Sequence, residues 1–267
     1  MYRITVIIGV YNCARTLVEA LDSLMIQTYK KFKVVICDDG SNDDTLKIAK
    51  KYAQKHGNMI VIKNDRNMGL NYTLNHCLKY VDTEYVARMD GDDIALPTRF
   101  EMEINFLDSH PEYAVVSTPM IYFDENGDFR SSHGNGEVCK KDFLYGSPIC
   151  HAPSMLRTSA IKSVGGYAID DHLLRVEDYN LWVRMYAAGY KAYNLTEPLY
   201  KMRDDRNARL RRNWMARRNE MYAMIHGIKL LGLPWYTQIY ALRPLFAYVV
   251  PTWLYNLYHR NKSERLK

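Results

Sequence analysis

The first half of the chain alternates between short apolar runs rich in β-branched residues and amphipathic segments, and this alternation restricts the fold more than any other feature. The apolar runs predict buried strands at residues 4–10, 32–39, 59–65 and 85–90. The segments between and after them predict helices at residues 16–28, 41–57, 69–81 and 97–109. Repeated strand–helix–strand units form a mostly parallel sheet with right-handed crossovers and helices on both faces. We therefore expect an α/β fold.

The second half of the chain is less regular. A strand beginning near Tyr113 and a turn at residues 125–127 are expected, followed by loops and short elements over residues 134–167. Residues 176–191 predict a helix that ends at Gly189. Its inward side chains are expected to be Leu181, Trp182, Met185 and Tyr186.

Composition limits the class of protein. The chain has 267 residues, of which 48% are apolar and 25% charged, as in a globular protein made of one large domain, with or without an appendage. The N-terminal apolar run is short and lacks the pattern of a secretory signal. Five scattered cysteines without a C-x-x-C pair predict a reduced chain in the cytoplasm, without structural zinc.

Polar residues follow each predicted strand of the first half. In an open parallel sheet, ligands bind beyond the carboxyl ends of the strands, so these residues are expected to share one site. They are Tyr11 and Asn12 after the first strand, Asp38 and Asp39 after the second, Asp65, Arg66 and Asn67 after the third, and Asp90 and Asp92 after the fourth.

The stretch Asp90-Gly91-Asp92-Asp93 places three carboxylates in four residues. It could be a solvated turn, because Asp and Gly are common in turns. It could also hold Mn²⁺ or Mg²⁺, whose charge would make the crowding tolerable. Neither a G-x-G-x-x-G fingerprint nor a G-x-x-x-x-G-K-[ST] loop is present, so a bound diphosphate would need a cation and basic side chains instead.

Five segments, read in order, resemble family 2 glycosyltransferases with the Rossmann-like GT-A fold: VIIGVYN, CDDGSNDDT, NDRNMG, ARMDGDD and VEDYNLWVR. The resemblance covers about residues 4–203. It implies a metal-dependent, inverting hexosyl- or N-acetylhexosaminyl-transferase that uses a UDP-sugar. The implied acceptor is a glycan or a lipid-linked saccharide in bacterial cell-surface polysaccharide synthesis. Residues 1–205 would form the catalytic domain, with a nucleotide-binding half (1–95) and an acceptor half (96–205), and residues 206–267 a C-terminal extension.

The resemblance also implies roles on the donor side. Val10, Tyr11 and Asn12 would line the nucleoside, and Asp39 would bind the uracil ring, whereas Asp38 would cap a nearby helix. Arg66 and Asn67 would flank the base and sugar. The following loop would contribute Asp90 near the ribose, Gly91 for close ligand approach, and Asp92, with Asp90, as metal ligands.

On the acceptor side, Asp178 is expected to be the general base and Glu177 to bind the donor sugar or the acceptor. The alternative for both is helix N-terminal acids that interact with the helix dipole. Asp93 serves the donor sugar or caps a turn, and His151 faces the acceptor or is a structural histidine. Arg203 would cover the diphosphate, although Asp204 and Asp205 follow it where the family often has His and Ser.

Residues 206–260 are basic at first and then apolar and aromatic, and we expect helices there. No apolar run reaches the roughly 20 residues of a membrane span. Two readings stay open: an extension lying on the inner face of the cell membrane, or helices packed on the core or in a homodimer. A nucleic-acid partner is not expected.

Two other functions compete with sugar transfer. A non-catalytic relative could act as a binding protein through its basic surface, but it would not need Asp39, Asp92 and Asp178 together. A nucleotidyltransferase would carry a glycine-rich and basic loop after the first strand, and GVYNCART does not supply one.

Overall fold

The computed structural model describes residues 1–204 and 214–249. Its main sheet has eight strands in the order β3-β2-β1-β4-β10-β6-β11-β9, and a second sheet has the order β5-β12-β7-β8. The main-sheet strands are β1 (Ile4–Val10), β2 (Phe32–Asp38), β3 (Met59–Lys63), β4 (Tyr85–Asp90), β6 (Tyr113–Ser117), β9 (Gly136–Glu137), β10 (Met155–Arg157) and β11 (Lys191–Asn194). The second sheet contains β5 (Ile94–Ala95), β7 (Met120–Asp124), β8 (Gly127–Ser131) and β12 (Tyr200–Arg203).

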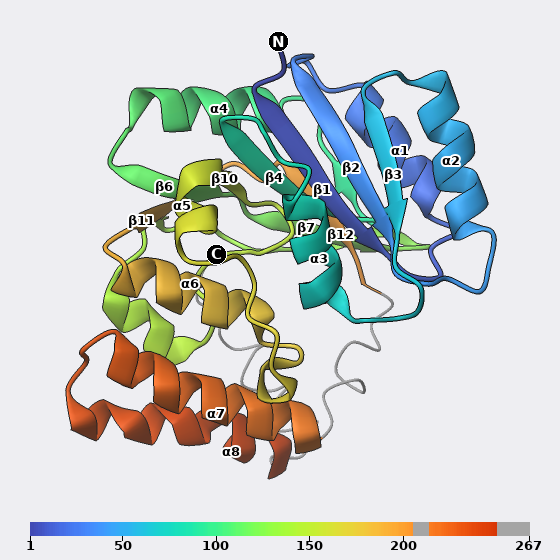
Figure 1. The fold of residues 1–267 in the computed structure, drawn as a ribbon. Coiled ribbons are helices and arrows are strands. Elements are labelled where there is room, and N and C mark those ends of the chain that lie inside the picture. Colours follow the sequence, from blue (N-terminus) through green and yellow to red (C-terminus); the bar gives the residue numbers. More distant parts are fainter. Residues whose placement is uncertain (205–213, 250–267) are drawn as a thin grey trace.

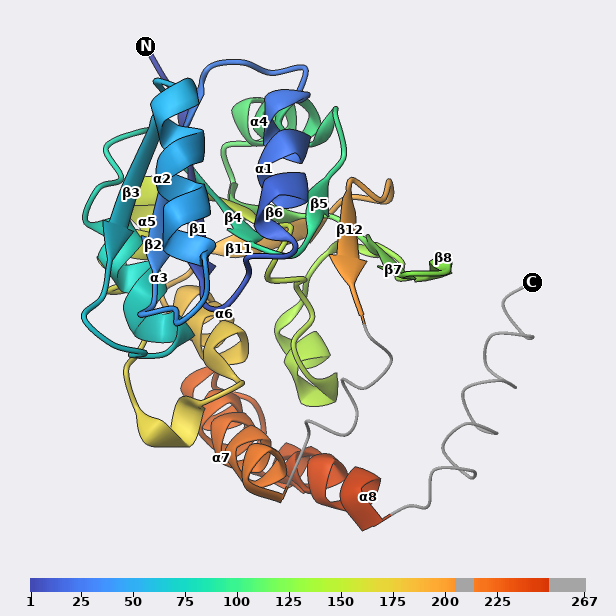
Figure 2. The same ribbon diagram turned by 90° about the vertical axis from the view of Figure 1, so that its right-hand side faces the viewer.

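The helices flank the main sheet (Figures 1 and 2). They are α1 (Leu17–Met25), α2 (Thr45–Lys55), α3 (Leu70–Leu78), α4 (Arg99–Ser109), α5 (Thr158–Ser163), α6 (Glu177–Ala187), α7 (Trp214–Leu230) and α8 (Arg243–Val249). Short 3₁₀ helices are η1 (Lys140–Tyr145), η2 (Asp171–Leu173) and η3 (Trp235–Leu242). The predicted α/β class is confirmed.

The pairing of the first strands is parallel, as their sequences predict. β1 pairs in parallel with β2 on one side and with β4 on the other, which places Val10 opposite Asp38 and Gly9 opposite Asp90. β10 is antiparallel to both of its neighbours, so the sheet is mixed rather than purely parallel. The register brings the carboxyl ends of β1, β2 and β4 to one edge, where the predicted polar residues lie.

Two apolar layers hold helices on opposite faces of the sheet. Alternate residues of β1 face different layers: Ile7 packs in a core with α3, α5 and α6, whereas Ile8 packs in a core with α1 and α4. The α6 side chains Leu181, Trp182, Met185 and Tyr186 are all buried, as predicted, and Gly189 ends the segment at φ +88°.

The C-terminal helices extend the fold beyond the sheet. In Figure 1, α7 and α8 lie next to α6 and away from the first strands. Ala223 and Met224 of α7 are buried in the same core as α6. In the part of the chain that the structure describes, no helix combines the length and apolar character that crossing a bilayer requires. Part of the helical prediction falls on residues 205–213 and 250–267, which lie outside the described residues.

Candidate active site

A cavity opens beyond the carboxyl end of β1. Four of the residues predicted to bind the nucleotide line it: Val10, Tyr11, Asp39 and Asn67. Arg66, the neighbour of Asn67, instead lines an adjacent hollow with Asp65 and Tyr72. The β1 and β2 ends and the loop before α3 therefore form one concave surface on the donor side.

Asp39 organises this cavity. Its buried carboxylate accepts hydrogen bonds from Asn64 Nδ2 (2.7 Å) and from the backbone amides of Met68 and Gly69 (both 2.9 Å). These bonds fix the β3–α3 loop against the end of β2. Asp38 accepts a hydrogen bond from the Ser41 amide at 3.2 Å, within the turn that leads to α2, and does not line the cavity. Asp39 rather than Asp38 thus has the position expected of a nucleotide-binding acid.

The loops around the cavity approach one another closely. Gly40 has φ +72°, and a Cβ there would lie 2.6 Å from the Arg66 carbonyl carbon, so this position favours glycine. Asn12, at φ +53°, donates its backbone amide to Ser41 Oγ (3.0 Å) and accepts from the Asn42 amide (2.9 Å). Asn12 therefore links the end of β1 to the loop before α2.

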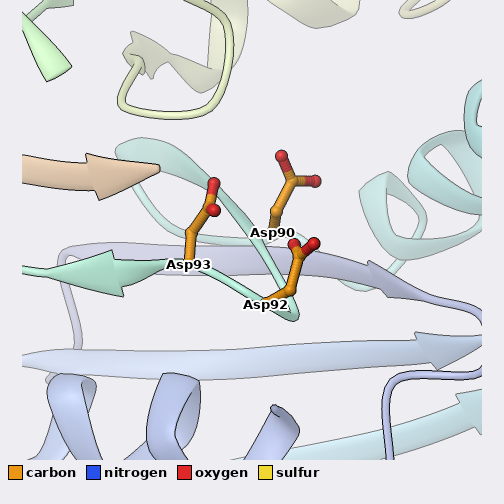
Figure 3. A group of neighbouring side chains, drawn as sticks. All are labelled: Asp90, Asp92 and Asp93. Atoms are coloured by element: carbon orange, nitrogen blue, oxygen red, sulfur yellow. The ribbon is translucent and has the colours of Figure 1, made fainter. Parts of the chain in front are cut away.

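The three carboxylates after β4 come together. Asp90, Asp92 and Asp93 each place a carboxylate oxygen within 4.8 Å of the others, and their side chains point to the same side of the loop (Figure 3). Burial and the charge of Asp90 raise the pKa of Asp92. Burial and the charges of Asp90 and Asp92 raise the pKa of Asp93 well above its ordinary value. A nearby cation would relieve this repulsion.

Arg88 neutralises part of the cluster. Its side chain is buried, and its two terminal nitrogens contact the two Asp90 oxygens, each at 2.5 Å. Such a two-pronged pair holds the carboxylate in a fixed orientation. Sequence reasoning did not assign a role to Arg88, although a charged residue inside an otherwise apolar strand was a usable signal.

The remaining carboxylates suit a divalent cation. Asp92 is exposed, and Asp93 Oδ2 is buried without a hydrogen-bond partner among the described residues. Oxygen ligands of this kind are the ones that Mg²⁺ and Mn²⁺ prefer. Asp92 and Asp93 therefore fit a metal, and Asp90, whose oxygens also contact Arg88, belongs to the same candidate group.

Arg203, at the end of β12, closes the same region. Its amide donates to Asp93 Oδ1 (2.8 Å), and its Nε donates to the Asp92 carbonyl (3.0 Å). The guanidinium also pairs with Glu19 and lies over the Phe123 ring. This cation is thus beside the acidic cluster, as the predicted contact with a diphosphate requires.

A second cavity contains Asp178. Glu177 and Asp178 are the first two residues of α6, and Asp178 lines this cavity with Ser147 and Met202. Burial raises the pKa of Asp178, opposed by the Tyr179 amide and the Ser147 hydroxyl. Burial and the charge of Asp178 raise the pKa of Glu177 to about 7. A carboxylate with a raised pKa in a cavity is suited to accept a proton.

His151 has a structural partner. Its Nε2 lies 2.8 Å from Tyr167 Oη, and its ring packs edge-on against Trp182. Burial and the charge of Arg88 lower the pKa of His151 well below its ordinary value. This arrangement matches the structural alternative for His151 better than the acceptor-facing one.

The donor-side cavity and the Asp178 cavity belong to one region of the protein. A Cβ on Gly91 would lie 2.6 Å from Val10 Cγ1, so the β4 loop lies directly against the donor-side cavity. On the other side, Met202 lines the Asp178 cavity, and its neighbour Arg203 contacts Asp92. The β4 loop therefore connects the linings of the two cavities: it packs against Val10 of the first and bonds to Arg203, the neighbour of Met202 in the second.

Comparisons with known proteins agree with this geometry. The family model described as glycosyl transferase family 2 matches residues 5–165. The glycosyltransferase EpsE of Bacillus subtilis (strain 168) is 38% identical over 262 residues, covering 97% of this chain and 94% of that protein. The Escherichia coli protein WfaP, a UDP-Glc:alpha-D-GlcNAc-diphosphoundecaprenol beta-1,3-glucosyltransferase, is 30% identical over 206 residues, covering 76% of this chain and 78% of that protein.

A solved structure has the same fold. The crystal structure of S. aureus TarS residues 1–349 with UDP-GlcNAc superimposes with a TM-score of 0.74 at 21% sequence identity. The match covers 92% of this chain and 73% of that one. The GT-A architecture expected from the sequence is thereby confirmed.

Proposed function

Because the chain belongs to glycosyl transferase family 2, we propose that it transfers a sugar, with inversion, from a UDP-sugar to a glycan or a lipid-linked saccharide in cell-surface polysaccharide synthesis. One observation carries the proposal: the loop with the acidic cluster packs against Val10 of the cavity around Asp39 and bonds to Arg203, which is next to Met202 of the cavity that contains Asp178. Such an arrangement offers neighbouring binding sites for a nucleotide, a diphosphate and an acceptor.

The donor-side cavity would hold the nucleoside. Val10, Tyr11 and Asn12 would contact it from the end of β1, Asp39 would bind the base, and Arg66 and Asn67 would flank it. UDP as the nucleotide is supported by the TarS complex with UDP-GlcNAc and by the UDP-Glc in the name of WfaP. Asp90 and Gly91 would adjoin the ribose, where Arg88 keeps the Asp90 carboxylate oriented.

Asp92 would hold Mn²⁺ or Mg²⁺, with Asp93 beside it. The bound cation would supply positive charge to the diphosphate as it leaves. Arg203, anchored on the backbone of Asp92, would add a second positive charge at the same place. These groups would stabilise the charge that develops on the leaving UDP.

Asp178 would act as general base. It would take the proton from the attacking acceptor hydroxyl while Glu177, next to it, binds the donor sugar or the acceptor. Asp178 is favoured over Glu177 as the base because only Asp178 is among the residues that line the second cavity.

Residues 206–267 would form an extension of the catalytic domain that contacts the cytoplasmic face of the membrane. The described part exposes large apolar side chains on η3 and α8: Trp235, Tyr236 and Ile239 on η3, and Phe246 on α8. Arg243 lies between them in the sequence. Aromatic side chains beside a cation are typical of a membrane-surface contact, and a lipid-linked acceptor, as in the name of WfaP, would be found there. A homodimer through the same face is the alternative.

Nucleotide binding tests the function directly. Purified protein should bind UDP in the presence of Mn²⁺, as measured by calorimetry, and should slowly hydrolyse one UDP-hexose or UDP-N-acetylhexosamine in a screen of donors. Asp92→Ala should abolish the metal-dependent part of UDP binding. Unchanged binding in this variant would remove the metal assignment, and lack of turnover with every donor and acceptor would favour a binding protein.

Membrane contact has its own test. The protein should sediment with vesicles of phosphatidylglycerol and phosphatidylethanolamine, and Trp235→Ser combined with Phe246→Ser should weaken this. Ile169→Ser, which changes an equally exposed apolar side chain far from η3 in sequence, is the control. A dimer that the double variant dissociates, without any vesicle binding by the wild type, would support the alternative.

A further inference from the structure

The cavity that contains Asp178 carries more charge than recognition of a neutral sugar requires. It has a volume of about 310 Å³ and lies between the turn at residues 146–147, the start of α6 and the start of α7. Two arginines, Arg175 and Arg217, line it together with Asp178 and Glu220. Neither arginine was singled out by the sequence, because they are 42 residues apart and join only through the packing of α7.

Arg175 lies in an unusual backbone conformation. Its φ is +67°, which is uncommon for a residue other than glycine and costs free energy that the surrounding structure must offset. Its side chain is exposed, and no described residue forms a hydrogen bond or ion pair with it. A free guanidinium at the rim of a cavity, on a strained backbone, is more typical of a ligand-binding residue than of a stabilising one.

Arg217 is largely enclosed. Its side chain is 12% exposed, and Nη1 contacts Glu220 Oε2 at 3.1 Å. Its Nε is buried and has no hydrogen-bond partner within residues 1–204 and 214–249. Part of this guanidinium is therefore available to an anion that enters the cavity.

Asn219 links the two segments of the chain that carry these arginines. It is buried, and its Nδ2 donates to the carbonyls of Asp171 (3.4 Å) and Leu174 (3.3 Å). Leu174 directly precedes Arg175, and Asn219 follows Arg217 by two residues. This bridge fixes the loop before α6 to α7, so both guanidinium groups belong to one preformed site.

The two arginines and two acids of the site are only partly paired. Glu220 contacts Nη1 of Arg217, and among the described residues no hydrogen bond or ion pair joins Asp178 to either arginine, so Arg175 and Nε of Arg217 remain open to an anion. Planar guanidinium groups bind phosphate oxygens in pairs and with better geometry than lysine.

We infer that this cavity binds an acceptor whose sugar carries a phosphate or diphosphate close to the hydroxyl that is glycosylated, held by Arg175 and Arg217. The inference rests on the proposed function, because it takes Asp178 as the base. It names the acceptor class: a sugar linked through phosphate, rather than the neutral end of a long glycan. A cavity of this size suits one sugar and its phosphate.

Binding of model acceptors tests the inference. The protein is first saturated with UDP and Mn²⁺, so that the donor site is filled. It is then titrated with the 1-phosphates of glucose, galactose and N-acetylglucosamine, and with the methyl glycosides of the same sugars. At least one 1-phosphate should bind about tenfold more tightly than its methyl glycoside, as expected for charge-assisted hydrogen bonds.

Two variants and one control variant show which side chains cause the preference for the 1-phosphate. Arg175→Gln and Arg217→Gln should each remove most of the preference for the phosphate while leaving UDP affinity unchanged. Arg218→Gln, an exposed neighbour on α7, should keep the preference. Arg175 is exposed, so its variant is expected to fold even if Arg217→Gln is destabilised.

The outcomes separate this inference from the proposed function. Failure to bind UDP would contradict the function itself. Normal UDP binding without any preference for a 1-phosphate, or without measurable binding of one, would overturn the inference alone. The same loss in Arg218→Gln as in the two variants would also overturn it, since the preference would then reflect the general positive charge of α7.

Discussion

The donor side and the acceptor side of the site are built in different ways. On the donor side, Val10, Asp39 and Gly91 follow the ends of three adjacent parallel strands, and the register of the sheet brings them together. On the acceptor side, Ser147, Asp178 and Arg217 come from segments that share no sheet register and meet only where α6 and α7 pack. Strand pairing therefore positions the proposed nucleotide site, whereas helix packing positions the proposed acceptor site.

If this division is correct, the largest effect should come from a change that removes chemistry on the acceptor side without disturbing the donor side. Asp178→Asn should lower turnover by roughly 10²–10⁴-fold, because the amide cannot accept the acceptor proton. The affinity for UDP with Mn²⁺ should stay nearly the same, since Asp178 is not among the residues that line the cavity around Asp39. Steady-state turnover and calorimetry on one protein sample would show the separation.

A neighbouring acid serves as the control for this variant. Asp171→Asn changes an exposed acid in the loop before α6, whose contact with Asn219 is made through its backbone carbonyl. It should leave turnover unchanged. Full activity in Asp178→Asn would place the base elsewhere, with Glu177 as the first candidate.

Arg88 acts on acids of both sides. It pairs with Asp90, and its charge opposes the rise in the pKa of Asp178. Arg88→Met leaves the carboxylate of Asp90 without its partner, close to Asp92 and Asp93, and should lower the free energy of unfolding by about 3–5 kcal/mol. Arg88→Lys keeps the charge but not the paired contacts, and should lower it by less. Denaturant unfolding measures both.

A variant of an exposed arginine serves as the control for the Arg88 variants. Arg130→Met removes a side chain that is 57% exposed and lies 3.9 Å from Asp204, so little change is expected. If Arg88→Met and Arg130→Met had similar effects, the buried pair of Arg88 and Asp90 would contribute no more to stability than an exposed pair.

The same division explains what could be predicted from the sequence. The donor side was predictable because continuous apolar runs rich in β-branched residues identify buried strands, and parallel strands place the residues at their ends along one edge; Asp39 and the three acids at the end of β4 were found in this way. The second sheet was predicted only at the turn between β7 and β8. The pairing of β12 with β5 and β7 was not predicted, because these strands are short and lie far apart in the sequence. Arg175 and Arg217 were missed for a related reason: nothing local marks residues that meet only through the docking of α7.

The contact between the β4 loop and β1 can be tested through Gly91. A Cβ at this position would lie 2.6 Å from Val10 Cγ1, so Gly91→Ala should force the loop away from β1 and cost about 1–3 kcal/mol of stability. UDP affinity should fall as well, because Val10 lines the nucleotide cavity. Gly57→Ala is the matched control, since no atom lies within 4 Å of its added Cβ. Equal effects of the two changes would mean that close packing does not shape the donor side.

The smallest expected effect concerns the pH dependence of stability on the acceptor side. The pKa of Glu177 rises from 4.5 in an unperturbed chain to about 7 in the folded protein. Between these values the folded protein keeps a proton that the unfolded chain has released, so the contribution of Glu177 to stability falls as the pH rises through this window.

Replacing Glu177 by Gln removes this titration. Relative to the wild type, Glu177→Gln should become more stable as the pH increases from 4.5 to 7, by about 1–2 kcal/mol, and the difference should level off above pH 7. Glu112→Gln, which changes an exposed glutamate, should show no such trend. Thermal or denaturant unfolding at several pH values would measure both differences. A flat difference for Glu177→Gln would mean that the start of α6 carries no unfavourable charge, in contrast to the cluster after β4, where neighbouring carboxylates raise the pKa values of Asp92 and Asp93.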